Sequence, residues 1–500
     1  MIRYIIYSLF LVGFTTNSLA QQPIYHFDSD LIIHKNVEYF GTLSKSEIKN
    51  QVNGTSQLNF NPVVSFNGID DYLKIDEQLY VDLDQMTAIT VFKPNINSKS
   101  DLAVWEMSSN SPNIALSTTK ATTDTNEIEY EGIDSDKPVI HTYTQYFKKN
   151  NRHFTNWLNV LKLGNKANSE NAFKGQIAEL LIFDRVLSKT ELEKINSRLA
   201  LKYGISLKEN QNYVASNNTI VWDGQDNSLF NHRITGIGRD GKNRLNQKQS
   251  TSSEEPDFLT IGSQEIAPTN NDNVGTIANL HYLIWGDNNL PFKINEGIID
   301  IENKSLPTTK RKWLMKASGD RTEELNTQLK VSASSVLNDS IQNLVLVINE
   351  SGKDDFSSTY EGLRFIYPTS IDEKGIFTYD KVYWDKDKSG KDMFSFVAEK
   401  NISLPQLDES NSITKAGQDI HFGVYPNLSA DGNFYIVMQL ESVQDVQIII
   451  YDLAGKQHTN KIVSGSQFYF LNNEFIAGSG IYNVVMTTGD IQISRKLIVN

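Results

Sequence analysis

Three glutamates alternate along one short segment of the chain, Glu127, Glu129 and Glu131. Residues at i, i+2 and i+4 of a β-strand share one face, so on a strand the three carboxylates would line up. Two carboxyl groups about 5 Å apart are what retaining glycoside hydrolysis requires, one as nucleophile and one as acid. The competing interpretation is a solvated strand face beside an acidic loop with Asp134 and Asp136. We favour the solvated face, predict no catalytic residues, and keep the three glutamates as the alternative catalytic set.

A second candidate site is the polar loop 385–392. Oxygen-bearing side chains at its first, third and fifth positions, followed by Gly390, copy the first half of an EF-hand calcium loop. The twelfth position is Phe396 rather than the bidentate glutamate, and three lysines interleave with the oxygen ligands. A hairpin turn between two apolar runs is therefore the favoured interpretation, and calcium is the only cofactor for which we find a candidate site. The candidate metal ligands are Asp385, Asp387, Ser389 and Asp392.

Other groups of residues that could do chemistry are compatible with ordinary turns. Asn67, Asp70 and Asp71 carry oxygens on a loop after a strand, which suits either a cation or simple turn formation. The segment 236–241 contains GxG without the rest of the dinucleotide fingerprint, so we interpret it as a strand that ends in a turn. No HExxH or G-x-S-x-G pattern occurs, which gives no support to a zinc protease or a serine hydrolase.

Short strands and one helix are the elements that must position these residues in the first part of the chain. The apolar run 177–183 predicts a strand, and Ser188 with Glu191 forms a capping box that predicts a helix start. Gly204 stands where a helix C-terminus favours a residue without Cβ. One face of this helix carries an apolar stripe at helical spacing, formed by Leu192, Ile195, Leu199 and Tyr203.

The rest of the chain is also predicted to be rich in strands. Residues 208–400 contain strand-like runs such as 258–262, separated by loops. Residues 402–419 are polar with little periodicity, which predicts a linker. Beyond it, Val446, Ile448 and Ile450 alternate as the buried face of a strand would. No repeat of fixed period is present.

Composition narrows the class of protein. A length of 500 residues suits about three domains, and an apolar content of 39% is enough for each to bury a core. The chain has no cysteine, which excludes disulfides, thiolate catalysis and cysteine–metal sites. Its net charge of −13, without a block of lysine or arginine, makes nucleic acid and anionic membrane surfaces poor partners.

The first 20 residues have the features of a secretory signal. Arg3 supplies a positive n-region, and residues 5–14 form an apolar stretch too short to span a bilayer. Ser18 and Ala20 place small residues where a signal peptidase reads them, so we expect cleavage before Gln21. No other run is long and apolar enough to cross a membrane, so the sequence predicts no integral membrane span.

The final 80 or so residues carry an ordered set of short motifs: YPN at 425–427, GNFYI at 432–436, YDLAGK at 451–456, GIYNVV at 480–485 and RKLIV at 495–499. This order resembles the type A C-terminal sorting domain of type IX secretion, although Leu428 stands where that family usually has a second proline. The resemblance implies an immunoglobulin-like sandwich and the type IX secretion machinery as a partner. The motif residues are Tyr425, Pro426, Asn427, Gly455, Lys456, Gly480, Tyr482 and Lys496.

The segments FNGIDDYLKI (66–75) and GQIAELLIFDRVLSKTELEKINSRLALKYGI (175–205) resemble the laminin-G-like, concanavalin A-like lectin domain of bacterial surface proteins. The resemblance implies a two-sheet jelly-roll, in which calcium at a rim would be held by acidic loop residues. Glucanases of this fold carry a Glu-x-Asp-x-Glu strand, whereas this chain has Glu129 at the central position. Residues 208–400 resemble an uncharacterised domain that commonly follows the lectin-like one in exported bacterial proteins.

Together these observations predict a mostly β protein. We expect a signal peptide (1–20), a jelly-roll sandwich with one C-terminal helix (21–207), a β-rich domain (208–400), a linker (401–420) and an immunoglobulin-like sandwich (421–500). The predicted function is a secreted or cell-surface protein, exported by type IX secretion, that binds carbohydrate or a surface ligand without catalysis. Polysaccharide or surface glycan is the expected ligand class. The alternative is a glycoside hydrolase that uses the glutamate strand.

Overall fold

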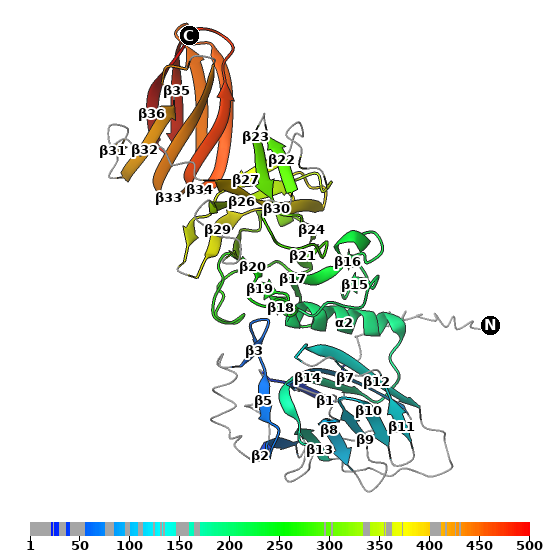
Figure 1. Cartoon of the computed structure of the whole chain (residues 1–500). Coiled ribbons are helices and arrows are strands. Elements are labelled where there is room, and N and C mark those ends of the chain that lie inside the picture. Colours follow the sequence, from blue (N-terminus) through cyan, green and yellow to red (C-terminus); the bar gives the residue numbers. More distant parts are fainter. Residues whose placement is uncertain are drawn as a thin grey trace, which may run out of the picture.

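The structure, a computed structural model, describes most of the chain in detail (Figure 1). The described residues are 22–23, 25–29, 37–40, 56–75, 85–95, 101–108, 114–123, 126–130, 133, 136–146, 160–164, 171–294, 297–301, 304–333, 341–354, 356, 363–372, 374–400, 412–415, 418–425, 427–429 and 432–500. The predicted signal peptide, Glu131 and Pro426 lie outside them. None of the helices in these ranges combines the length and apolar character that crossing a membrane requires.

The first unit is a sandwich of two antiparallel sheets around one hydrophobic core. One sheet has the order β1 (Tyr25–Asp28), β14 (Lys174–Phe183), β7 (Gln85–Pro94) and β12 (Val139–Tyr146), and β5 (Val64–Asn67) also pairs with β14. The other has the order β11 (Glu127–Glu129), β10 (Lys120–Thr123), β9 (Ile114–Ser117), β8 (Ala103–Ser108), β13 (Val160–Gly164), β6 (Tyr72–Ile75) and β2 (Val37–Phe40). Phe27, Trp105 and Leu180 are among the side chains buried between them.

The helix α2 (Lys189–Tyr203) lies between this sandwich and the next unit (Figure 1). The predicted capping box is present: the Glu191 backbone N–H bonds to the Ser188 side chain, and the Glu191 carboxylate accepts from the Ser188 backbone N–H. Gly204 adopts a left-handed conformation with φ 66° and ends the helix. Leu199 and Tyr203 pack on the sandwich, whereas Ala200 and Leu201 pack on the following unit. The helix is therefore shared by two hydrophobic cores.

The second unit is again built on two sheets. The larger has the order β18 (Leu245–Gln247), β17 (His232–Asp240), β21 (His281–Asp287), β24 (Trp313–Ser318), β30 (Lys391–Lys400), β23 (Lys304–Thr308) and β22 (Gly297–Ile301), with β26 (Ile341–Asn349) pairing with β30 and β27 (Leu363–Ile366). The smaller has the order β19 (Gln249–Thr251), β20 (Leu259–Ser263), β25 (Thr327–Ser332), β29 (Ile376–Val382) and β28 (Ser370–Ile371). Short elements complete the unit: the pair β15 (Tyr213–Val214) and β16 (Ile220–Trp222), and the 3-10 turns η3 (Ser228–Phe230) and η4 (Thr322–Glu324).

The third unit lies at the far end of the molecule from the first (Figure 1). Its strands are β31 (Ser412–Lys415), β32 (Gln418–Tyr425), β33 (Asn433–Asp452), β34 (Gln457–Phe475), β35 (Gly480–Thr488) and β36 (Ile491–Val499). Val446, Ile448 and Ile450 are buried in its core, as their alternation predicts. β31 and the start of β32 lie in the segment that the sequence predicts as a linker. Ser412 to Lys415 pair with β32, so this part of the segment belongs to the sheet of the third unit. The prediction of a mostly β protein built of sandwiches is confirmed.

Candidate functional site

The glutamates of the alternative catalytic set lie on an edge strand. Glu127 and Glu129 are exposed on β11, the last strand of its sheet, where Lys120 Nζ lies 3.0 Å from Glu127 Oε1. Glu131 lies outside the described residues. The two described carboxylates therefore sit at the surface beside a lysine, an arrangement that suits a solvated strand face.

The loop 385–392 connects β29 to β30 and brings together only part of the candidate calcium set. Asp385 and Asp392 are buried and adjacent, with Asp392 Oδ2 accepting a 2.6 Å hydrogen bond from the Asp385 backbone N–H. Asp385 itself accepts from the Gly390 N–H and the Thr322 hydroxyl. Burial raises the pKa of Asp392 to about 7, because a charged carboxylate loses its hydration there.

The other two candidate calcium ligands serve the turn. Asp387 is exposed and accepts a 3.0 Å bond from the Ser389 N–H, while the Ser389 hydroxyl donates to the Lys391 carbonyl at 2.9 Å. Lys388 Nζ lies 2.8 Å from Glu323 Oε1. Most oxygens of the loop thus accept hydrogen bonds from the loop or its neighbours, and the calcium site stays a prediction.

The loop at Asn67 uses its polar groups in the same way. Asn67 Oδ1 accepts from the backbone N–H groups of Ile69, Asp70 and Asp71 at 2.8, 3.2 and 3.2 Å. Asp71 Oδ2 in turn accepts from the Asn67 N–H at 2.9 Å. These bonds hold a tight turn, which is the structural role that the residue types allow.

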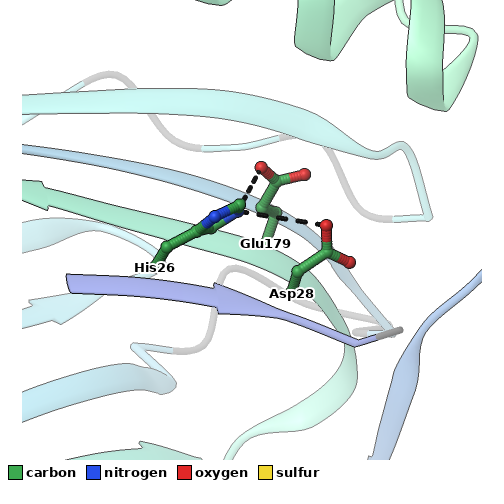
Figure 2. Close-up of side chains that lie close together, drawn as sticks. All are labelled: His26, Asp28 and Glu179. Atoms are coloured by element: carbon green, nitrogen blue, oxygen red, sulfur yellow. Dashed lines mark hydrogen bonds and ion pairs between the residues drawn. The ribbon is translucent and has the colours of Figure 1, made fainter. Parts of the chain in front are cut away.

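A buried charge cluster under α2 is a feature that the sequence did not predict (Figure 2). Figure 2 shows Glu179 of β14 facing His26 and Asp28 of the neighbouring strand β1. Glu179 Oε1 lies 2.8 Å from His26 Nε2, and Lys202 Nζ lies 2.8 Å from Asp28 Oδ2. Lys202 Nζ is also 3.1 Å from Glu179 Oε2.

Two further donors from α2 reach the same carboxylate. Glu179, which is 0% exposed, accepts from Arg198 Nη2 at 2.6 Å and from the Tyr203 hydroxyl at 2.9 Å. Burial alone would raise the pKa of Glu179, but Arg198 and Lys202 outweigh that effect and hold it well below its usual range. The opposing charges make this an ion-pair network between sandwich and helix.

Within the described residues, one set of side chains has ligand atoms that lie close enough together to hold a metal ion. The set is His26, Asp28 and Glu179. Both carboxylates already bond to the Lys202 ammonium, and Glu179 bonds to the Arg198 guanidinium as well. A divalent cation would have to displace these buried positive charges. The donor set therefore fits a structural salt-bridge network rather than a metal centre.

The hairpin of β3 (Gln57–Leu58) and β4 (Asn61–Pro62) inserts from the sandwich into the second unit. Asn59 Nδ2 donates to the carbonyls of Leu201 and Lys202, both at 3.1 Å, and thus satisfies the end of α2. Asn59 Oδ1 accepts from the Thr251 N–H at 2.8 Å. Asn61 Nδ2 donates to Gln247 Oε1 at 3.1 Å. These buried amide bonds join sandwich, helix and second unit.

An open pocket of about 540 Å³ lies where the exposed face of α2 meets the two loops that flank β15 and β16. Figure 1 shows α2, β15 and β16 side by side, and contacts between α2 and β15 agree. Amides, carboxylates, one lysine and two leucines form its wall. The lining residues are Lys189, Leu192, Glu193, Asn196, Leu207, Asn210, Gln211, Asn212, Asp223 and Gln225.

The residues of the sorting motif lie on the third unit. Gly455 has φ 82° and sits in the turn between β33 and β34, where Lys456 is exposed. Tyr482 is buried, and its hydroxyl donates to the Gly478 carbonyl at 2.7 Å. Of the others, Tyr425 ends β32, Asn427 is exposed, Gly480 begins β35 and Lys496 is exposed on β36.

Comparisons with known proteins give one family match and distant structural similarities. Residues 191–388 match a family described as "Domain of unknown function (DUF8202)". This match covers most of residues 208–400, for which the sequence indicates an uncharacterised domain, and it begins inside α2. A comparison with curated proteins finds no match.

Among solved structures, domain 4 of AbnA, a GH43 extracellular arabinanase from Geobacillus stearothermophilus, in complex with arabinotriose, is 13% identical. The similarity covers 34% of this chain and 96% of that chain, with a TM-score of 0.23. The binding domain of botulinum neurotoxin DC in complex with SialylT is 10% identical over 76% of this chain and 100% of that chain, with a TM-score of 0.26. The β-glucuronidase of Parabacteroides merdae is 12% identical. The similarity covers 35% of this chain and 28% of that chain, with a TM-score of 0.14. Because the TM-scores are low, these similarities carry no argument about function.

Proposed function

We propose that this is an exported, non-catalytic protein of the cell surface or medium that binds carbohydrate or another surface ligand. The observation that carries the proposal is the open, amide-rich pocket beside α2, which is lined by that helix and by the loops that flank β15 and β16. A pocket into which several polar groups converge is a common site for a ligand. The described residues of the alternative catalytic set, Glu127 and Glu129, are exposed on an edge strand, which favours binding over hydrolysis.

The export part of the proposal rests on the two ends of the sequence. The first 20 residues have the charge, apolar stretch and small residues of a secretory signal. The order of motifs between Tyr425 and Val499 resembles a type IX sorting domain. We therefore place the protein outside the inner membrane, with the type IX secretion machinery as its transport partner.

Affinity electrophoresis tests the binding part. The chain from Gln21 to Asn500 is run through gels that contain algal, plant or host polysaccharides, with and without a chelator. We expect retardation on at least one polymer, and the same retardation with chelator. Migration that no polymer slows would contradict carbohydrate binding and redirect the search to protein ligands.

Cell fractionation tests the export part. A chain that lacks residues 421–500 should stay inside the cell envelope, whereas the full chain should reach the surface or the medium. Equal amounts of both chains outside the cell would contradict a sorting role for the third unit.

A further inference from the structure

The loops around the pocket are held in place by hydrogen bonds that need no ligand. Asn212 Oδ1 accepts from the Gly224 N–H at 2.9 Å and ties the two loops together. Gly224 lies so close to the other loop that a Cβ would come within 2.5 Å of the Asn210 carbonyl carbon. Asp223 Oδ1 accepts from the N–H groups of Gln225 and Asp226 at 2.9 and 3.0 Å. The loops are therefore ordered before a ligand arrives, which reduces the entropy cost of binding.

The wall of the pocket that α2 forms is also held in place by hydrogen bonds, as the loops are. The Ser197 hydroxyl donates to the Glu193 carbonyl at 2.6 Å and accepts from the Val214 N–H at 2.8 Å, so α2 is bonded to β15 directly beside the pocket. On its other side, α2 is held to the sandwich by the buried Glu179 cluster and by Asn59. One wall of the pocket is therefore formed by α2, a helix that is held in place by two hydrophobic cores and by the charge cluster around Glu179.

The chemistry of the lining selects a class of ligand. Side-chain amides offer both donors and acceptors, which matches hydroxyl groups that also do both. Asn196 contributes an Oδ1 that is buried and has no hydrogen-bond partner among the described residues. Leu192 and Leu207 supply apolar surface on which the C–H face of a sugar ring can lie. No aromatic platform is among the lining residues.

The charges of the lining residues narrow the ligand class further, because they disfavour anionic ligands. The Lys189 ammonium lies 3.7 Å from a Glu193 carboxylate oxygen, so this pair is close to neutral. Asp223 adds a negative charge on the opposite wall. The whole chain is also acidic, with a net charge of −13. An anionic ligand would meet repulsion from both sources.

We infer that this pocket is a preformed site for a neutral saccharide, such as one or two uncharged sugar rings of a longer glycan. Its volume of about 540 Å³ is that of a typical small-molecule pocket. The inference rests on the proposed function and deepens it, since it assigns that function to one site and one ligand class. It requires no metal ion.

A glycan array tests the inference with the chain from Gln21 to Asn500. The array carries neutral oligosaccharides and matched ones with uronate or sulfate groups. We expect binding to neutral members, unchanged by EDTA, and weaker binding to their acidic counterparts. A preference for the acidic members would overturn the inferred ligand class.

A double variant, Gln211→Ala with Gln225→Ala, assigns the binding to the pocket. Both side chains are exposed and line the pocket, and their removal leaves the loop bonds of Asn212 and Asp223 in place. We expect affinity for the best neutral glycan to fall about 10-fold or more, the scale of two lost hydrogen bonds. Asn246→Ala, an exposed amide on β18 outside the pocket, is the matched control and should bind like the parent chain.

A second variant, Gln225→Trp, places a bulky side chain at the pocket mouth and should block binding as well. Melting temperatures of all variants should match that of the parent chain. Parent binding that neither pocket variant weakens would overturn the site while leaving the proposed function intact. A parent chain that binds no glycan at all would overturn the proposed function together with the site.

Discussion

Replacing Glu179 by Gln probes the charge cluster that fixes α2 on the sandwich. The substitution keeps the size of the side chain but removes its charge and turns one acceptor oxygen into a donor. Glu179 accepts from Arg198, Lys202 and Tyr203 in a site where it is 0% exposed. The variant would leave two buried cations with Asp28 as their remaining carboxylate in this cluster.

The expected loss follows from that geometry. Removing one partner of a buried ion pair typically costs about 3–5 kcal/mol, because the other charge stays desolvated and uncompensated. The free energy of unfolding of a native protein is typically about 5–15 kcal/mol, so this loss is a large fraction of the total stability. The pKa of Glu179 is held well below its usual range, so its contribution is fully present above the unfolded pKa. It is lost as pH falls through the lower folded pKa.

Urea unfolding followed by tryptophan fluorescence measures this loss. The six tryptophans all lie between residues 105 and 384, so the signal reports on the first two units. Glu193→Gln is the control, since its exposed pair with Lys189 should contribute only about 0.3–0.5 kcal/mol. A Glu179→Gln loss no larger than that of the control would refute the view that the cluster holds α2 in place.

Three further changes test other parts of the structure. Asn59→Ala should destabilise the joined units by about 2–4 kcal/mol, because the Leu201 carbonyl and the Thr251 N–H lose the Asn59 side chain as their partner, whereas the Lys202 carbonyl still accepts from Asn61 Nδ2; a loss under about 1 kcal/mol in urea would count against the hairpin as a joint. Burial lowers the pKa of His141 from 6.5 to about 4, so stability present above pH 6.5 should decline as pH falls toward 4. His141→Phe should flatten that slope in thermal melts at several pH values, and an unchanged slope would exclude His141 as its source. Calcium should leave the melting temperature unchanged, because most side-chain oxygens of loop 385–392 already accept hydrogen bonds; a calcium-dependent rise that Asp385→Asn abolishes would instead establish the predicted site.

Local features of this protein could be predicted from its sequence because their partners are close in the chain. The capping box of Ser188 and Glu191 spans three residues, and its bonds are those the residue types predict. The same holds for the Asn67 turn, whose partners lie within four residues. Alternation identified the buried face of Val446, Ile448 and Ile450 for the same reason, since strand geometry fixes it locally.

Tertiary structure alone decided which polar residues that are far apart in the sequence meet. Glu179 is the charged residue in the otherwise apolar run 177–183, and its partner His26 lies 153 residues away. The pairing of β1 with β14 places Asp28 opposite Glu179, and the shift of register between Ile177 and Glu179 marks a bulge at this point. Bulges re-aim side chains, and here Glu179 reaches three residues of α2. The pocket arises in the same way, because Asn196, Gln211 and Asp223 line one pocket only once α2 has docked on β15. No sequence spacing encodes such contacts, since long-range register and helix docking set them.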